Sequence, residues 1–175
     1  MAWLISMARI GQDAGRRCTI FTNKLYHETA VLFELARLEW VEVRVLDDCD
    51  AIAAAARDAE APAGVFLDSS RPDGDVRAVA RILRDIDPER IGCVVWDNTC
   101  APIGDHPFAD PATPGAPRTP LLLLRSHAKL DQLGLEFCAL GTLALVSQPT
   151  ATDAARGVIE GLDKYLPQAL AVSGG

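Results

Sequence analysis

Apolar and polar positions follow two different periods along this chain. Short apolar or alternating runs, each typical of a strand, occupy residues 18–22, 41–46, 63–68, 91–97, 119–124 and 138–147. Stretches with apolar residues at helical spacing lie between and after them, at 2–14, 28–40, 51–60, 75–86 and 151–166. The strict alternation of 41–46 predicts a strand with one solvent-facing side, and Asp75 stands where a helix N-cap is expected.

Strands that alternate with helices predict an α/β fold with a mostly parallel sheet and helices on both faces. Residues 98–118 interrupt this order, because they contain five prolines and few apolar residues, and they predict a long loop. The length of 175 residues predicts one domain, spanning 1–175. We see no internal repeat and no low-complexity tract.

Composition narrows the class of partner. The formal net charge of −7 and the pI near 4.9 argue against a nucleic-acid backbone as ligand. The five cysteines form no CxxC pair and the three histidines are far apart, so no metal site is expected. The chain has no signal-peptide pattern and no run of the roughly 18 apolar residues that a membrane span needs. We therefore expect a cytoplasmic protein with no membrane contact.

Reactive side chains follow several of the predicted strands. Ligands of open parallel sheets bind beyond the carboxyl ends of the strands. The side chains expected at that edge are Tyr26, Ser69, Arg71, Asp97, Thr99, Ser126 and Lys129. A desolvated lysine amine forms Schiff bases with carbonyl compounds, and a carboxylate opposite it can hold a protonated pyridine nitrogen.

Four motifs carry a family resemblance. "NKLYHET", "FLDSSRPDG", "VVWDNTCAP" and "LLLLRSHAKLDQLG" occur in this order, with 71 residues from Tyr26 to Asp97 and 32 from Asp97 to Lys129. Together they resemble the large domain of fold-type I pyridoxal-phosphate enzymes. The closest group is that of the cystathionine γ-synthases, cystathionine γ-lyases and methionine γ-lyases of cysteine and methionine metabolism. The resemblance covers roughly residues 15–147.

The resemblance implies a role for each matched residue. Lys129 would hold the cofactor, pyridoxal 5'-phosphate, as a Schiff base and later remove a proton from an amino-acid substrate. Asp97 would keep the pyridine nitrogen protonated, and Tyr26 would stack on the ring. Ser126 would contact the phosphate, and Thr99 would lie near the ring hydroxyl. The implied reaction is β- or γ-elimination or replacement, with transamination as an alternative.

The chain also departs from this family. It lacks the small-residue phosphate loop before the tyrosine motif, and it lacks the small C-terminal domain with the arginine that binds the substrate carboxylate. Arg71 stands where the family has an asparagine on the cofactor ring, and Ala128 where it often has a serine or threonine. Two hypotheses follow: a split enzyme, in which a partner chain of a heteromer supplies the missing parts, or a degenerate scaffold or regulatory subunit.

Each candidate residue also has an ordinary structural interpretation. Lys129 would be a solvated surface lysine, Asp97 the start of an Asx-turn, Tyr26 a half-buried aromatic at a helix start, and Ser126 a turn cap. A nucleotide-binding doubly wound domain is a further alternative. It would require a GxGxxG or GxxxxGK[ST] turn after an early strand, and neither occurs here.

Overall fold

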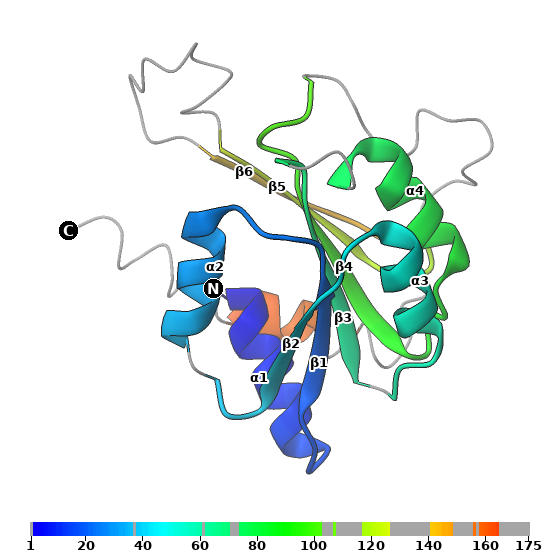
Figure 1. The fold of residues 1–175 in the computed structure, drawn as a ribbon. Coiled ribbons are helices and arrows are strands. Elements are labelled where there is room, and N and C mark those ends of the chain that lie inside the picture. Colours follow the sequence, from blue (N-terminus) through cyan, green and yellow to red (C-terminus); the bar gives the residue numbers. More distant parts are fainter. Residues whose placement is uncertain are drawn as a thin grey trace.

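The computed structural model describes residues 2–36, 38–60, 62–70, 74–102, 107, 117–126, 141–148, 156 and 158–164. Helices and strands alternate along most of them, as the hydrophobic pattern predicts (Figure 1). The elements are α1 (Ala2–Asp13), β1 (Cys18–Thr22), α2 (His27–Ala36), β2 (Val41–Val45), α3 (Cys49–Arg57), β3 (Ala63–Asp68), α4 (Val76–Asp85), β4 (Ile91–Asp97), β5 (Leu121–Ser126) and β6 (Gly141–Val146). Residues 158–164 are helical as well.

The six strands form one sheet in the order β2-β1-β3-β4-β5-β6. The first five strands in this order are parallel, and β6 runs antiparallel to β5. This confirms the predicted α/β class with a mostly parallel sheet. Parallel strands end at a common edge, so the carboxyl ends of β1, β3, β4 and β5 lie along one side of the molecule.

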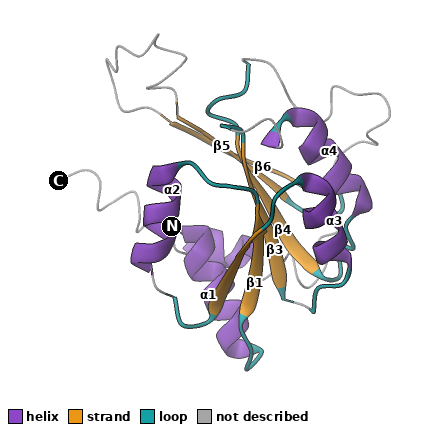
Figure 2. Cartoon of the chain, viewed as in Figure 1, coloured by secondary structure: helices purple, strands orange, loops and turns teal. Residues whose placement is uncertain are grey.

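Helices cover both faces of the sheet (Figure 2). Each face carries its own apolar core. One face of the sheet, called the α1 face, is covered by α1, α2 and the helical residues 158–164. Its core includes Met7, Ile20 and Phe66. The α3 face packs against α3 and α4, and its largest buried side chain is Trp96, with no exposed surface. β3 and the first six residues of β4 are buried throughout, as expected for central strands covered on both sides.

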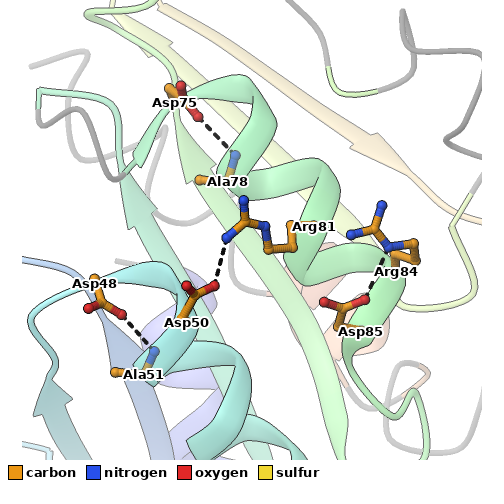
Figure 3. Close-up of polar contacts among 8 residues, drawn as sticks. All are labelled: Asp48, Asp50, Ala51, Asp75, Ala78, Arg81, Arg84 and Asp85. Carbon is orange, nitrogen blue, oxygen red and sulfur yellow. Dashed lines mark hydrogen bonds and ion pairs between the residues drawn. The ribbon is translucent and has the colours of Figure 1, made fainter.

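The helices α3 and α4 begin at aspartate N-caps (Figure 3). Asp48 accepts a hydrogen bond from the Ala51 N–H, and the predicted cap Asp75 accepts one from the Ala78 N–H, both at 2.8 Å. An exposed ion pair of 2.6 Å between Arg81 and Asp50 links the two helices. Solvent screens such a pair, so the apolar contacts of the α3 face hold these helices in place.

Two strands differ from their predicted form. β5 continues two residues beyond the predicted Leu124, because Arg125 and Ser126 pair with Thr142 and Gly141 of β6. β2 was predicted to have one solvent-facing side, yet its valine side is partly exposed too, with Val45 at 59%. The reason is that β2 is an edge strand of the sheet.

Among the described residues, no helix has the length and hydropathy that a membrane crossing requires.

Candidate functional site

The carboxyl ends of β3, β4 and β5 lie in step at one edge of the sheet. Asp97 is the register partner of Asp68 on one side and of Leu124 on the other. The main chain continues this alignment past the strands, since the Ser69 N–H donates to the Asp97 carbonyl at 2.9 Å and the Asn98 N–H to the Leu124 carbonyl at 2.8 Å. The first residues of these loops are therefore fixed by the sheet itself.

Asp97 lies at this edge with one carboxylate oxygen in use. Val95, two residues earlier in β4, belongs to the α1 face, so the side chain of Asp97 is on that face as well. Its Oδ1 accepts the Thr99 N–H at 3.0 Å, the Asx-turn that was the ordinary interpretation of this residue. Among the described residues, none donates to Oδ2. Both interpretations of Asp97 are compatible with this geometry.

Thr99 and Ser126 meet across the loop openings. The Ser126 N–H donates to Thr99 Oγ1 at 3.0 Å, so two predicted site residues from different loops are in direct contact. Arg125 reinforces this edge, because its Nη1 donates to the Asn98 carbonyl at 2.7 Å and to the Ala101 carbonyl at 3.0 Å. The turn after β4 is thus bound to the end of β5 by three hydrogen bonds from Arg125 and Ser126.

Tyr26 also lies at this edge, immediately before α2. Its carbonyl accepts the Ala30 N–H, and its own N–H donates to Asp68 Oδ2 at 2.7 Å. The residue is 36% exposed, and its ring centroid lies 4.3 Å from that of His27. This is the helix-start aromatic of the ordinary interpretation, with a ring that a ligand can still reach.

The remaining predicted site residues, Arg71 and Lys129, lie outside the described residues, as do His127 and Ala128. The structure therefore brings together Tyr26, Asp97, Thr99 and Ser126, with Ser69 beside them. The roles assigned to all six site residues by resemblance stay predictions.

Sequence reasoning missed two residues of this edge that the structure makes prominent. Asp68 is 3% exposed and Asn23 is fully buried. The Asn23 amide bonds the main chain of Asp68 twice, with Nδ2 donating to the carbonyl at 3.0 Å and Oδ1 accepting the N–H at 2.9 Å. The available signal was a polar residue directly after the apolar run "CTIFT" and another at the end of "AGVFLD".

Asn98 is a third residue of interest at this edge. Its Oδ1 is buried and has no hydrogen-bond partner among the described residues, a state shared there only by Nε1 of Trp3. Unsatisfied buried polar atoms are uncommon in folded proteins. The turn after β4 therefore has two oxygen acceptors that receive no hydrogen bond from a described residue, Asn98 Oδ1 and Asp97 Oδ2, next to each other in sequence.

Two of the described cysteines, Cys18 and Cys93, belong to the apolar core of the α1 face. Cys18 and Cys93 are fully buried, and burial raises the pKa of each thiol to about 12. Cys100 is exposed, and its N–H donates to Ser69 Oγ at 3.0 Å. Within the part of the chain that the structure describes, no group of three or more His, Cys, Asp or Glu side chains could bind a metal ion.

Gly74 tests how tightly this edge is packed. A Cβ added to Gly74 would overlap the carbonyl group of Asp68 and lie 2.8 Å from Asn23 Nδ2. We expect Gly74→Ala to lower the free energy of unfolding by about 2–3 kcal/mol, because main-chain atoms must shift. Gly15→Ala is the control, since its φ of +66° is strained for alanine but nothing lies within 4 Å. Its expected cost is about 1 kcal/mol. Equal losses in urea unfolding would contradict the overlap.

Comparison with known proteins relates this architecture to a group of enzymes. No protein-family model matches the sequence, and no curated protein matches it. Among solved structures, the chain is similar to apo CalE6, a methionine gamma lyase from Micromonospora echinospora, with 22% identity and a TM-score of 0.52. The match covers 95% of this chain and 42% of the lyase.

The chain has the fold of these enzymes. Aspartate aminotransferase from Trypanosoma cruzi is similar as well, with 14% identity and a TM-score of 0.55 over 93% of this chain and 46% of that one. The O-acetylhomoserine sulfhydrylase of Wolinella succinogenes has 17% identity and a TM-score of 0.50, over 99% and 49%. The predicted resemblance is confirmed at the level of the fold, and this chain spans less than half of each of these proteins.

Proposed function

We propose that this chain carries the cofactor-binding part of a pyridoxal-phosphate-dependent enzyme that acts on an amino acid. The supporting observation is the carboxylate of Asp97 at the carboxyl edge of the sheet, where ligands of such sheets bind, because its Oδ2 accepts no hydrogen bond from a described residue. The neighbouring strand β5 ends at Ser126, and Lys129 follows three residues later. The fold shared with a methionine gamma lyase and an aspartate aminotransferase supports the same class of enzyme.

The described residues fit this cofactor. Pyridoxal phosphate supplies an aldehyde for covalent attachment and a protonated pyridine ring that withdraws electrons from the substrate. Asp97 would accept the ring N–H at Oδ2, because no described residue donates to that oxygen. Thr99 accepts the Ser126 N–H at Oγ1 and keeps its hydroxyl proton for a ligand oxygen, since none of the described residues accepts it. The half-exposed ring of Tyr26 offers a stacking surface.

Three further roles belong to the proposal. Lys129 would attach the cofactor through its amine, and this amine would also take the proton from the α-carbon of the substrate. Ser126 would contribute its hydroxyl to the phosphate, and Arg71 would contact the cofactor where the resembling family has an asparagine. The reaction is elimination or replacement at the β- or γ-carbon, and transamination is the alternative.

We further propose that a partner chain completes the site with a phosphate loop and a group for the substrate carboxylate. Arg125 lies at this edge, but its Nη1 is already used by the carbonyls of Asn98 and Ala101. The group for the substrate carboxylate therefore has to come from outside the described residues, and in the proposed heteromer the partner chain supplies it.

The absorption spectrum with pyridoxal phosphate tests the proposal. We would record it for this chain alone and for the chain co-expressed with the product of its neighbouring gene, each before and after borohydride. A visible band that borohydride removes, with the added mass on Lys129, is the expected result. A band only in the co-expressed sample supports the partner chain. No band in either sample would refute the cofactor and favour the degenerate scaffold.

A further inference from the structure

Asp68 is a buried carboxylate whose charge is met by main-chain N–H groups. It ends β3, is 3% exposed, and forms no ion pair with any described lysine or arginine. Its Oδ2 accepts the Tyr26 N–H at 2.7 Å, and its Oδ1 accepts the Ser70 N–H at 2.8 Å. Bonds of this kind to a charged acceptor are among the stronger hydrogen bonds in proteins. Both oxygens are therefore occupied, and Asp68 is not itself available to a ligand.

The main chain of Asp68 is fixed from two sides. The two hydrogen bonds from the Asn23 amide continue the pairing of β1 with β3 beyond its last register pair, Thr22 with Phe66. On the other side, Gly74 lies against the Asp68 carbonyl group, and the indole of Trp96 donates to the Gly74 carbonyl at 2.9 Å. The direction of the Asp68 carboxylate is thus set by the sheet.

This carboxylate meets the first turn of α2. Tyr26 precedes the helix, and its carbonyl accepts the Ala30 N–H. The bond from its own N–H to Asp68 therefore holds the backbone of Tyr26 on both sides of its Cα. A carboxylate at a helix N-terminus is also favoured by the helix dipole. The contact joins residues 42 positions apart, and it holds the backbone of Tyr26 at the edge where Asp97 lies.

We propose that Asp68 is a positioning residue. By holding the backbone of Tyr26, it places the Tyr26 ring where the ring can stack on the ligand. The identity of the ligand, a pyridine ring, rests on the proposed function. The placement of Tyr26 by Asp68 does not depend on that function. A half-exposed aromatic ring stacks well on a ligand only if its backbone does not move when the ligand binds. Asp68 supplies this fixed backbone and acts on the ligand only through Tyr26.

The first test follows the ring of Tyr26 without any ligand. The chain has two tyrosines, Tyr26 and Tyr165, so protein labelled with 3-fluorotyrosine gives two fluorine resonances, and Tyr26→Phe assigns them. We expect Asp68→Asn to shift or broaden the Tyr26 resonance, because an NH2 group, which only donates, replaces one of the two carboxylate oxygens that accept the N–H groups. Asp75→Asn is the matched control, since Asp75 uses a single oxygen as a helix cap, and it should leave the resonance unchanged.

A second measurement on the wild-type chain covers the case in which Asp68→Asn does not fold. The Tyr26 amide should exchange slowly with deuterium, because its acceptor is buried. Exchange at the rate of an unprotected amide would overturn the proposal. So would an unchanged Tyr26 resonance in folded Asp68→Asn.

The third measurement is the affinity for pyridoxal phosphate, alone or in the co-expressed complex. Asp68→Asn should weaken binding roughly tenfold, the size of one stacking contact, and should add almost nothing in a Tyr26→Ala background. Equal losses in both backgrounds would overturn action through Tyr26. If the wild-type binds no pyridoxal phosphate in either form, the proposed function fails, and the resonance and exchange data alone uphold or overturn the placement of Tyr26 by Asp68.

Discussion

Replacement of Lys129 by alanine is expected to abolish the covalent attachment of pyridoxal phosphate to this chain. The attachment requires an amine that can form a Schiff base, and alanine has none. The measurement is the mass added after borohydride reduction at one equivalent of cofactor, mapped by peptide. The visible band should disappear together with the added mass, while the far-ultraviolet circular dichroism should stay that of the folded chain.

The small number of lysines in the chain allows the attachment site to be assigned without ambiguity. It has only three lysines, Lys24, Lys129 and Lys164. Lys24 and Lys164 are exposed, and Lys24 follows Asn23 at the same edge of the sheet, so Lys24→Ala and Lys164→Ala are matched controls. Both should keep the band. Added mass that persists in Lys129→Ala, or that maps to Lys24 in the wild-type, would contradict the assignment of Lys129.

Trp96→Ala should cause the largest loss of stability among the changes considered. Trp96 has no exposed surface and fills the core between β4 and the helices α3 and α4. Removal of a buried tryptophan side chain costs about 3–5 kcal/mol, a large part of the 5–15 kcal/mol that typically stabilises a domain. Urea unfolding followed by circular dichroism measures the loss. A cost below about 1 kcal/mol would mean that Trp96 does not fill this core.

The hydrogen bond of Trp96 can be separated from its packing. Trp96→Phe removes the donor to the Gly74 carbonyl and keeps most of the ring. Trp3→Phe is the control, because Trp3 is 5% exposed and its Nε1 has no partner among the described residues. We expect Trp96→Phe to cost about 0.5–1.5 kcal/mol more than Trp3→Phe, the net value of one hydrogen bond. Equal costs would assign Trp96 a packing role only.

Trp96 and Gly74 connect the core to the candidate site. The indole bond fixes Gly74, Gly74 lies against the Asp68 carbonyl, and the Asp68 carboxylate holds Tyr26. A buried aromatic residue on the α3 face is thus connected through these contacts to a residue of the candidate site. Replacement of Trp96 is therefore expected to affect ligand affinity as well as stability.

The pattern of apolar residues predicted the elements of this fold with good precision in its centre. The bounds of β3 and β4 agree with the predicted runs 63–68 and 91–97, because central strands are apolar on both faces and end abruptly at polar residues. The cap Asp75 was predicted from its position alone, since an N-cap bond is local. The end of β5 was placed two residues early, because its extension depends on pairing with β6.

The candidate site was predicted only in part, because some of its contacts also depend on residues that are distant in the sequence. The edge of the sheet that bears Tyr26, Asp97, Thr99 and Ser126 follows from the order of strands and helices, which the sequence shows. The hydrogen bond from the Tyr26 N–H to Asp68 does not follow from that order. Its partners are 42 residues apart, and the residues around each of them give no sign of the contact.

The sequence by itself therefore determined the order of strands and helices, the α/β class, and the edge at which the candidate side chains gather. Only the tertiary structure decided the strand order β2-β1-β3-β4-β5-β6, the antiparallel direction of β6, and the buried contacts of Asn23, Asp68 and Trp96. Hydrophobic periodicity and caps act over a few residues and are visible in the sequence. Register between distant strands, and the hydrogen bonds of buried polar groups, arise only when the whole sheet is packed.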